Sequence, residues 1–206
     1  MGTLNSLYHA VYKDVLSSLK ERDYIKADTR ESDSSLYDHL VLTAGIAVAT
    51  LKELLCRGKT TEELCGVDIP EIDLVNIVRI SSLLHDWGKD HPATYKNHRS
   101  RSIEFARKYF LKKGIKEPYT GLILGAIEKH HISCRPRTYL EKIVCLADSL
   151  ASASDRTTLK DTADLTRILA LSESTYNLYK TIFEEDDGLV LILGDVDKVK
   201  AYICLL

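Results

Sequence analysis

The sequence lacks the features that would place it in several large classes of protein. Its five cysteines include no CxxC pair and are odd in number, which argues against a thiolate zinc site and against a complete disulfide framework. The N-terminus has no charged-then-apolar signal segment, and no apolar run approaches the roughly 20 residues that a membrane helix needs. We therefore expect a cytoplasmic protein with reduced thiols and no membrane contact.

An excess of charge of one sign is also missing. The chain has 28 Lys and Arg against 30 Asp and Glu, a net charge of −2 and a pI near 6.4. No global basic field draws such a protein onto nucleic acid, so a polynucleotide substrate would have to be held by a local groove, a metal or partner subunits. With 206 residues, 45% of them hydrophobic, the chain is long enough for one good-sized core.

Histidines and aspartates, in contrast, form an ordered series along the chain. Apolar residues at helical spacing predict an all-α bundle, with helices over 36–56, 73–85, 119–131 and 139–153 and another that begins at residue 98. Each member of the series lies in or at the end of one of these helices, and His9 and His91 fall outside it. The members are His39, His85, Asp86, His98, His130, His131 and Asp148.

This set of ligands indicates a centre for two divalent transition-metal ions. Imidazole and carboxylate without thiolate suit Mn, Fe, Co, Ni or Zn. Asp86 follows a ligand histidine and is best placed to bridge the ions, one completed by His39, His85 and Asp148 and the other by His98, His130 and His131. Two ions about 3.5–4 Å apart activate water for in-line attack on phosphorus, which predicts hydrolysis of phosphate esters. One histidine of the doublet could instead contact the substrate.

Other polar residues beside these ligands are candidates for catalysis and substrate binding. Lys89 stands four residues after His85, where its ammonium could offset charge on the transferred phosphoryl group, so we predict Asp86 and Lys89 as the catalytic pair. The alternative is that Lys89 is a solvated turn residue and that the basic residues below are a solvated face. The candidates for substrate binding are Lys96, Arg99, Arg135, Arg137 and Arg156, together with Arg101 and Tyr95.

The pattern changes near the C-terminus. A sixth helix is predicted over 165–185, followed by a continuous apolar run between Gly188 and Gly194 that reads as a strand and by a helix from Asp195 to Leu206. We therefore divide the chain into a helical domain, residues 1–187, and the start of a further domain, residues 188–206.

The order of ligands resembles that of the HD superfamily of metal-dependent phosphohydrolases. Three segments are similar to the HD nuclease domain in the large subunit of type III CRISPR effector complexes (the Csm/Cmr large subunit). These are Ser35-Leu-Tyr-Asp-His39, His85-Asp-Trp-Gly-Lys89, and the run from Ala147 to Arg156. The tail from Leu191 to Ile203 looks like the start of the palm domain, related to cyclases and polymerases, that follows the HD domain in that family. A type I-D large subunit is an alternative.

The resemblance implies a nuclease that cuts single-stranded DNA with a pair of transition-metal ions. Its partners would be the guide-RNA-containing subunits of a CRISPR effector complex, and its role would be antiviral defence. Two alternatives stay open: an HD-type phosphohydrolase that acts on nucleotides or other small phosphates, and a catalytically idle interaction module of the complex.

Overall fold

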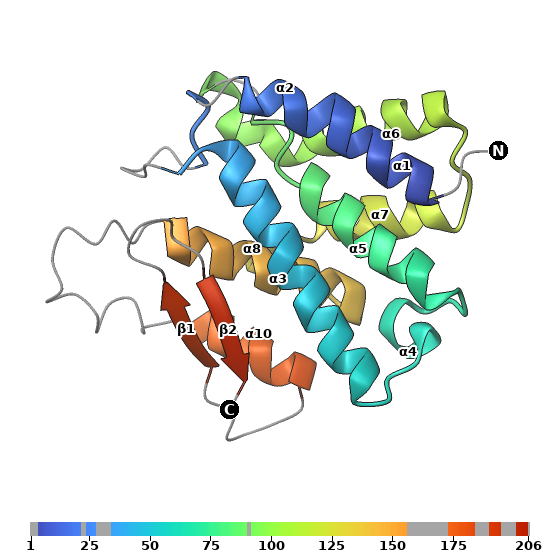
Figure 1. The fold of residues 1–206 in the computed structure, drawn as a ribbon, viewed down its shortest axis with the longest axis vertical. Coiled ribbons are helices and arrows are strands. Elements are labelled where there is room, and N and C mark those ends of the chain that lie inside the picture. Colours follow the sequence, from blue (N-terminus) through green and yellow to red (C-terminus); the bar gives the residue numbers. More distant parts are fainter. Residues whose placement is uncertain are drawn as a thin grey trace, which may run out of the picture.

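A long central helix, α3, organises the molecule, and helices α5 and α8 pack on it (Figure 1). The structure is a computed structural model that describes residues 4–21, 24–27, 34–89, 92–155, 173–183, 190–194 and 201–205. The helices are α1 (Leu4–Val11), α2 (Ser17–Lys20), α3 (Leu36–Cys56), α4 (Thr61–Cys65), α5 (Glu71–Leu84), α6 (His98–Lys113), α7 (Tyr119–Glu128), α8 (Tyr139–Asp155) and α10 (Glu173–Phe183). A π-helical turn (Tyr12–Leu16) joins α1 to α2, and 3₁₀ turns cover Pro92–Asn97 and Ile132–Cys134.

Helix α3 begins at Leu36, directly after its N-cap residue Ser35. The Ser35 hydroxyl accepts a hydrogen bond from the backbone N–H of Asp38 at 3.1 Å, which satisfies one of the free donors of the first turn. This cap puts His39 in the first turn, with 1% of its surface exposed. Leu40 and Leu51 on the same helix are fully buried, so the packing that stabilises α3 also fixes the position of His39.

By length and composition alone, α3 could cross a membrane, and it is the one such helix among the described residues. The core helix of a globular protein passes the same test. Here α3 packs along α5 and α8 and carries buried polar residues such as Thr43 and His39. These contacts favour its role as the core helix of the bundle.

Helix α5 delivers the His85-Asp86 pair to the interior. Its residues Leu74, Ile77 and Ile80 are fully buried, and the helix ends at Leu84 directly before the pair. The following turn is closed by the N–H of Lys89, which donates to the carbonyl of Asp86 at 2.9 Å. Both His85 and Asp86 are fully buried as a result.

The all-α bundle agrees with the fold expected from the sequence, with two corrections. Helix α7 ends at Glu128 and not at the His130-His131 doublet. Lys129 is its C-cap residue, and His131 already has extended backbone angles. The helix predicted from Asp195 is wrong over Ala201–Leu205, which form strand β2 antiparallel to β1 (Val190–Gly194). The β-branched and aromatic residues of this apolar segment suit a paired strand. The first part of the sixth predicted helix lies outside the described residues.

Candidate metal centre

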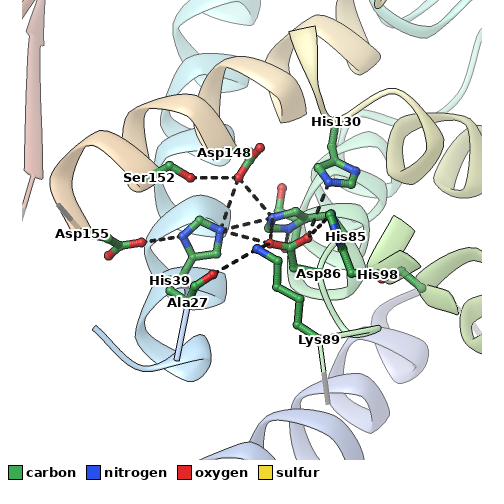
Figure 2. A network of polar contacts seen from close by, with 12 residues as sticks. Ala27, His39, His85, Asp86, Lys89, His98, His130, Asp148, Ser152 and Asp155 are labelled. Carbon is green, nitrogen blue, oxygen red and sulfur yellow. Dashed lines mark hydrogen bonds and ion pairs between the residues drawn. The ribbon is translucent and has the colours of Figure 1, made fainter. Parts of the chain in front are cut away.

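The structure brings all seven members of the histidine and aspartate series together, although they come from α3, α6, α8 and the segments that follow α5 and α7. Figure 2 shows the members other than His131. The seven residues form two groups, within each of which the potential ligand atoms lie within 4.8 Å of one another. One group is His39, His85, Asp86 and Asp148, and the other is His98, His130 and His131.

Asp86 lies between the two groups with one oxygen toward each. Its Oδ1 is 3.2 Å from Nε2 of His98 and 3.5 Å from Nε2 of His130. Its Oδ2 is 3.5 Å from Nε2 of His85 and 3.7 Å from Nε2 of His39. A carboxylate in this position can bridge two cations, and the fully buried side chain leaves it little other freedom.

Asp148 and His131 connect the groups a second time. Oδ1 of Asp148 is 3.3 Å from Nε2 of His39 and 3.4 Å from Nε2 of His85. Its Oδ2 is 3.4 Å from Nδ1 of His131, whose Nε2 is 3.0 Å from Nε2 of His98. The side chain of His131 is 36% exposed, so the centre opens toward solvent on this side.

Four of the histidines are held by their outer nitrogen. Nδ1 of His85, His98 and His130 donates to the backbone carbonyl three residues earlier, those of Ser82, Tyr95 and Ile127, at 2.5–2.7 Å. Nδ1 of His39 donates to the carboxylate of Asp155 at 2.6 Å. Because each acceptor requires a proton on Nδ1, all four rings present Nε2 to the centre, which is the usual arrangement of metal-binding histidines.

Such an arrangement needs cations. Nε2 of His39 and Nε2 of His85 lie 3.3 Å apart, and two lone pairs at that distance repel unless a proton or a metal ion lies between them. Nε2 of His130 is buried and makes no hydrogen bond among the described residues. Burial lowers the pKa of His130 to about 4, so this ring is neutral and its lone pair points at Asp86. These donors therefore fit divalent transition-metal ions.

Nearby charges set the protonation states of the buried residues His85 and Asp86. Burial raises the pKa of Asp86, but the charges of His85 and then Lys89 lower it more, so that the carboxyl stays ionised far below its usual range. Burial likewise lowers the pKa of His85, whereas Asp86 and then Asp148 raise it, to about 10 overall. In the metal-free protein at neutral pH, His85 therefore carries a proton on Nε2.

Lys89 lies beside the centre. Its Nζ is 2.5 Å from Oδ2 of Asp86 and also donates to the carbonyl of Ala27 at 3.0 Å. With 14% of its side chain exposed, Lys89 is not a solvated turn residue. Its ammonium holds the segment 24–27 against the centre and offsets the charge of Asp86.

Most of the candidates for substrate binding lie on the surface. Lys96, Arg99, Arg135 and Arg137 are exposed, as is Arg101. The guanidinium of Arg99 contacts Sγ of Cys134, and the hydroxyl of Tyr95 donates to the carbonyl of Lys26 at 2.6 Å. Arg156 lies outside the described residues. The structure thus leaves these five candidates as side chains on the surface.

Asp155 is the functional residue that the sequence analysis missed. It is 5% exposed and binds His39, yet no motif drew attention to it as a member of the site. The helical period could have indicated it: Asp155 follows Asp148 by seven residues and so lies on the same face of α8.

The arrangement agrees with a comparison against family models, in which the HD domain matches residues 36–153. This chain belongs to the HD domain family. With its buried His/Asp cluster, the HD domain is a metal-dependent phosphohydrolase. Comparisons with curated proteins and with solved structures found no match.

The protonated state of His85 predicts that metal binding releases a proton. A metal ion held by Nε2 must displace the proton that the raised pKa of about 10 keeps there. We expect the affinity for Mn²⁺ to rise with pH between 7 and 9, about tenfold per pH unit for one proton. Calorimetry at pH 7.5 in two buffers of different ionisation enthalpy measures this release. Equal heats in both buffers would contradict it.

The raised pKa of His85 also predicts that the metal-free HD domain becomes less stable as the pH rises. Because the pKa of His85 is raised in the folded state, its contribution to stability is complete below pH 6.5 and is lost as the pH rises toward 10.

Proposed function

We propose that this HD domain is a phosphodiesterase that cuts single-stranded DNA. The observation that carries the proposal is a basic segment that begins at the centre. Residues 96–113 contain seven Lys and Arg and one acidic residue, whereas the whole chain has 28 basic and 30 acidic residues. A local excess of this kind attracts a polyanion despite the negative net charge.

The basic residues are aligned along α6, whose first residue is His98. Arg101, Lys108 and Lys112 are spaced by seven and four residues, so they lie within about 20° of one line on the helix, and all are exposed. We name these three residues the α6 stripe. It extends roughly 16 Å, and Nε of Arg101 donates to the carbonyl of Gly88 at 3.3 Å, which fixes one end beside the His85-Asp86 turn.

The seven ligand candidates would hold the metal ions, which would supply Lewis-acid activation of water and of the scissile phosphate. The chain's own residues do the remaining work. Asp86 and Asp148 fix the imidazoles through their two oxygens, and Lys89 provides a cation beside Asp86 that can offset charge on the phosphoryl group. The 36% exposed side chain of His131 marks the open side, from which a polymer can reach the centre without entering a closed pocket.

We further propose that the domain works as part of a CRISPR effector complex in the cytoplasm. The support is the likeness of the segments Ser35–His39, His85–Lys89 and Ala147–Arg156 to the large subunit of type III complexes. In this proposal residues 188–206 open a palm domain, and the partners are the subunits that hold the guide RNA. The strand at Val190–Gly194 is compatible with a first palm strand, but the antiparallel β2 is not the helix expected after it.

The proposal is tested by a substrate panel and a charge-reversed α6 stripe. With Mn²⁺, Ni²⁺ or Co²⁺ the protein should cleave labelled single-stranded DNA. Lys108→Glu/Lys112→Glu should weaken binding of that DNA and lower the slope of log affinity against log salt by roughly 0.7 for each lost phosphate contact. Hydrolysis of a small aryl phosphodiester reports in parallel whether the metal centre is intact.

The control is Lys13→Glu/Lys20→Glu, which reverses the charge of two exposed lysines on the N-terminal helical run and so changes the net charge by the same amount. If the protein hydrolyses mononucleotides and leaves DNA uncut, the small-molecule phosphohydrolase is the correct alternative. If the metal binds and no substrate in the panel is hydrolysed, the proposal fails in favour of an idle module.

A further inference from the structure

Two aspartates of helix α8 flank His39, one beside each ring nitrogen. Oδ1 of Asp148 lies 3.3 Å from Nε2, and Oδ2 of Asp155 lies 2.6 Å from Nδ1. Figure 2 shows the imidazole between the two carboxylates, with Asp155 on the side away from the rest of the cluster. The two aspartates are seven residues apart, which is two helical turns or about 10 Å along α8, a span that the His39 ring fills.

The contact with Asp155 differs from that of the other three histidines. His85, His98 and His130 donate Nδ1–H to a neutral carbonyl of their own segment, three residues earlier. His39 donates to a charged carboxylate 116 residues away, and the pair is buried, with side-chain exposures of 2% and 4%. A charge-assisted hydrogen bond in a buried place is stronger than a neutral one and makes the opposite nitrogen a better electron donor.

Local structure does not account for Asp155. Asp155 is only 5% exposed, so its carboxylate has been removed from water at a cost in free energy. The hydrogen bond to His39 offsets that cost, since it gives the buried carboxylate a charge-assisted partner.

We propose that Asp155 is a positioning residue for the metal centre. It keeps the proton of neutral His39 on Nδ1, fixes the plane of the ring, and strengthens Nε2 as a donor in the group formed with His85, Asp86 and Asp148. The inference rests on metal binding by the HD domain and is independent of which phosphodiester is the substrate.

The test is metal affinity, measured without turnover. Asp155→Ala should weaken binding of Mn²⁺ or Co²⁺ by roughly 10–100-fold in calorimetry, in line with the loss of an outer partner of a ligand histidine. Asp155→Asn retains an oxygen that can accept from Nδ1 and should restore part of that loss. Burial lowers the pKa of His39, but the contacts with Asp148 and Asp155 raise it more, so imidazole ¹⁵N spectra of the metal-free protein are recorded at a pH above this raised pKa. They should show the Nδ1–H tautomer of His39 in the wild type and in Asp155→Asn, and a mixture of tautomers in Asp155→Ala.

The matched control is Asp14→Asn, which changes an exposed carboxylate that contacts Tyr109 and Lys113 and should leave the affinity unchanged. A lower melting temperature with unchanged affinity in both Asp155 variants would overturn the inference and reduce Asp155 to a structural residue. If Asp155→Ala does not fold, the metal affinity of Asp155→Asn and the tautomer of His39 in that variant decide whether Asp155 positions His39. Failure of the wild type to bind either metal would instead refute the metal-dependent function.

Discussion

Asp86→Asn is expected to abolish metal-dependent hydrolysis while leaving the helical fold in place. Asparagine has the same size but removes the negative charge and replaces one acceptor oxygen by a donor. The two oxygens of Asp86 face the two groups of ligand candidates, so a side chain with a single acceptor oxygen could not bind ions on both sides. Losing Lewis-acid stabilisation worth several kcal/mol corresponds to a rate lower by roughly a thousandfold or more.

The measurement is turnover of the aryl phosphodiester with Mn²⁺, together with metal content after dialysis and circular dichroism. Asp73→Asn is the matched control, because Asp73 also accepts a hydrogen bond, from Tyr119 at 2.9 Å, but lies near the other end of α5, about 20 Å away. Wild-type turnover in Asp86→Asn would exclude the bridging role.

Gly88→Ala is expected to have the next largest effect, through the position of α6. An added Cβ would lie 2.1 Å from the carbonyl oxygen of His98 and 2.8 Å from Cβ of Arg101, so the backbone at the start of α6 must move away. The N–H of Gly88 also donates to Ser102 at 2.8 Å, a contact that the same movement breaks. His98 would then leave Asp86, and a displacement of about 1 Å costs roughly a hundredfold in rate.

Gly88→Ala should also lower the free energy of unfolding by about 1–3 kcal/mol, the usual cost of overpacking. Gly45→Ala is the matched control, because a Cβ there meets nothing within 4 Å and Gly45 lies inside α3. It should raise stability by about 1 kcal/mol with activity unchanged. Chemical denaturation measures the free energy of unfolding, and turnover of the aryl phosphodiester with Mn²⁺ measures the rate. Equal behaviour of the two variants would show that the approach of the His85-Asp86 turn to α6 has no role.

Most of the metal centre could be predicted from the sequence because its ligand candidates are recognised from short segments. Each ligand candidate stands at a particular place on a helix whose apolar period is visible, so His39, the His85-Asp86 pair and Asp148 could be placed on elements before any geometry was known. The prediction was poorest where short-range signals conflict. Lys129 ends α7 before the doublet, and the apolar tail pairs as a strand where a helix was expected over Ala201–Leu205.

Other features depend on distances between segments that are remote in the chain. The contact of Asp155 with His39 spans 116 residues, and that of Lys89 with the carbonyl of Ala27 spans 62. Neither residue type nor spacing specifies such a partner, because many acceptors were available to either side chain. The need for glycine at position 88 arises in the same way, from the close approach of α6.

Periodicity and residue chemistry are properties of short segments, so the helical class, the types of ligand and hence the kind of metal chemistry follow from the sequence. The three-dimensional arrangement was needed to learn how the two oxygens of Asp86 are shared, which nitrogen each histidine offers, and that two aspartates of α8 flank His39. These depend on how α3, α5, α6 and α8 pack, and packing is the sum of many weak contacts that no single segment contains.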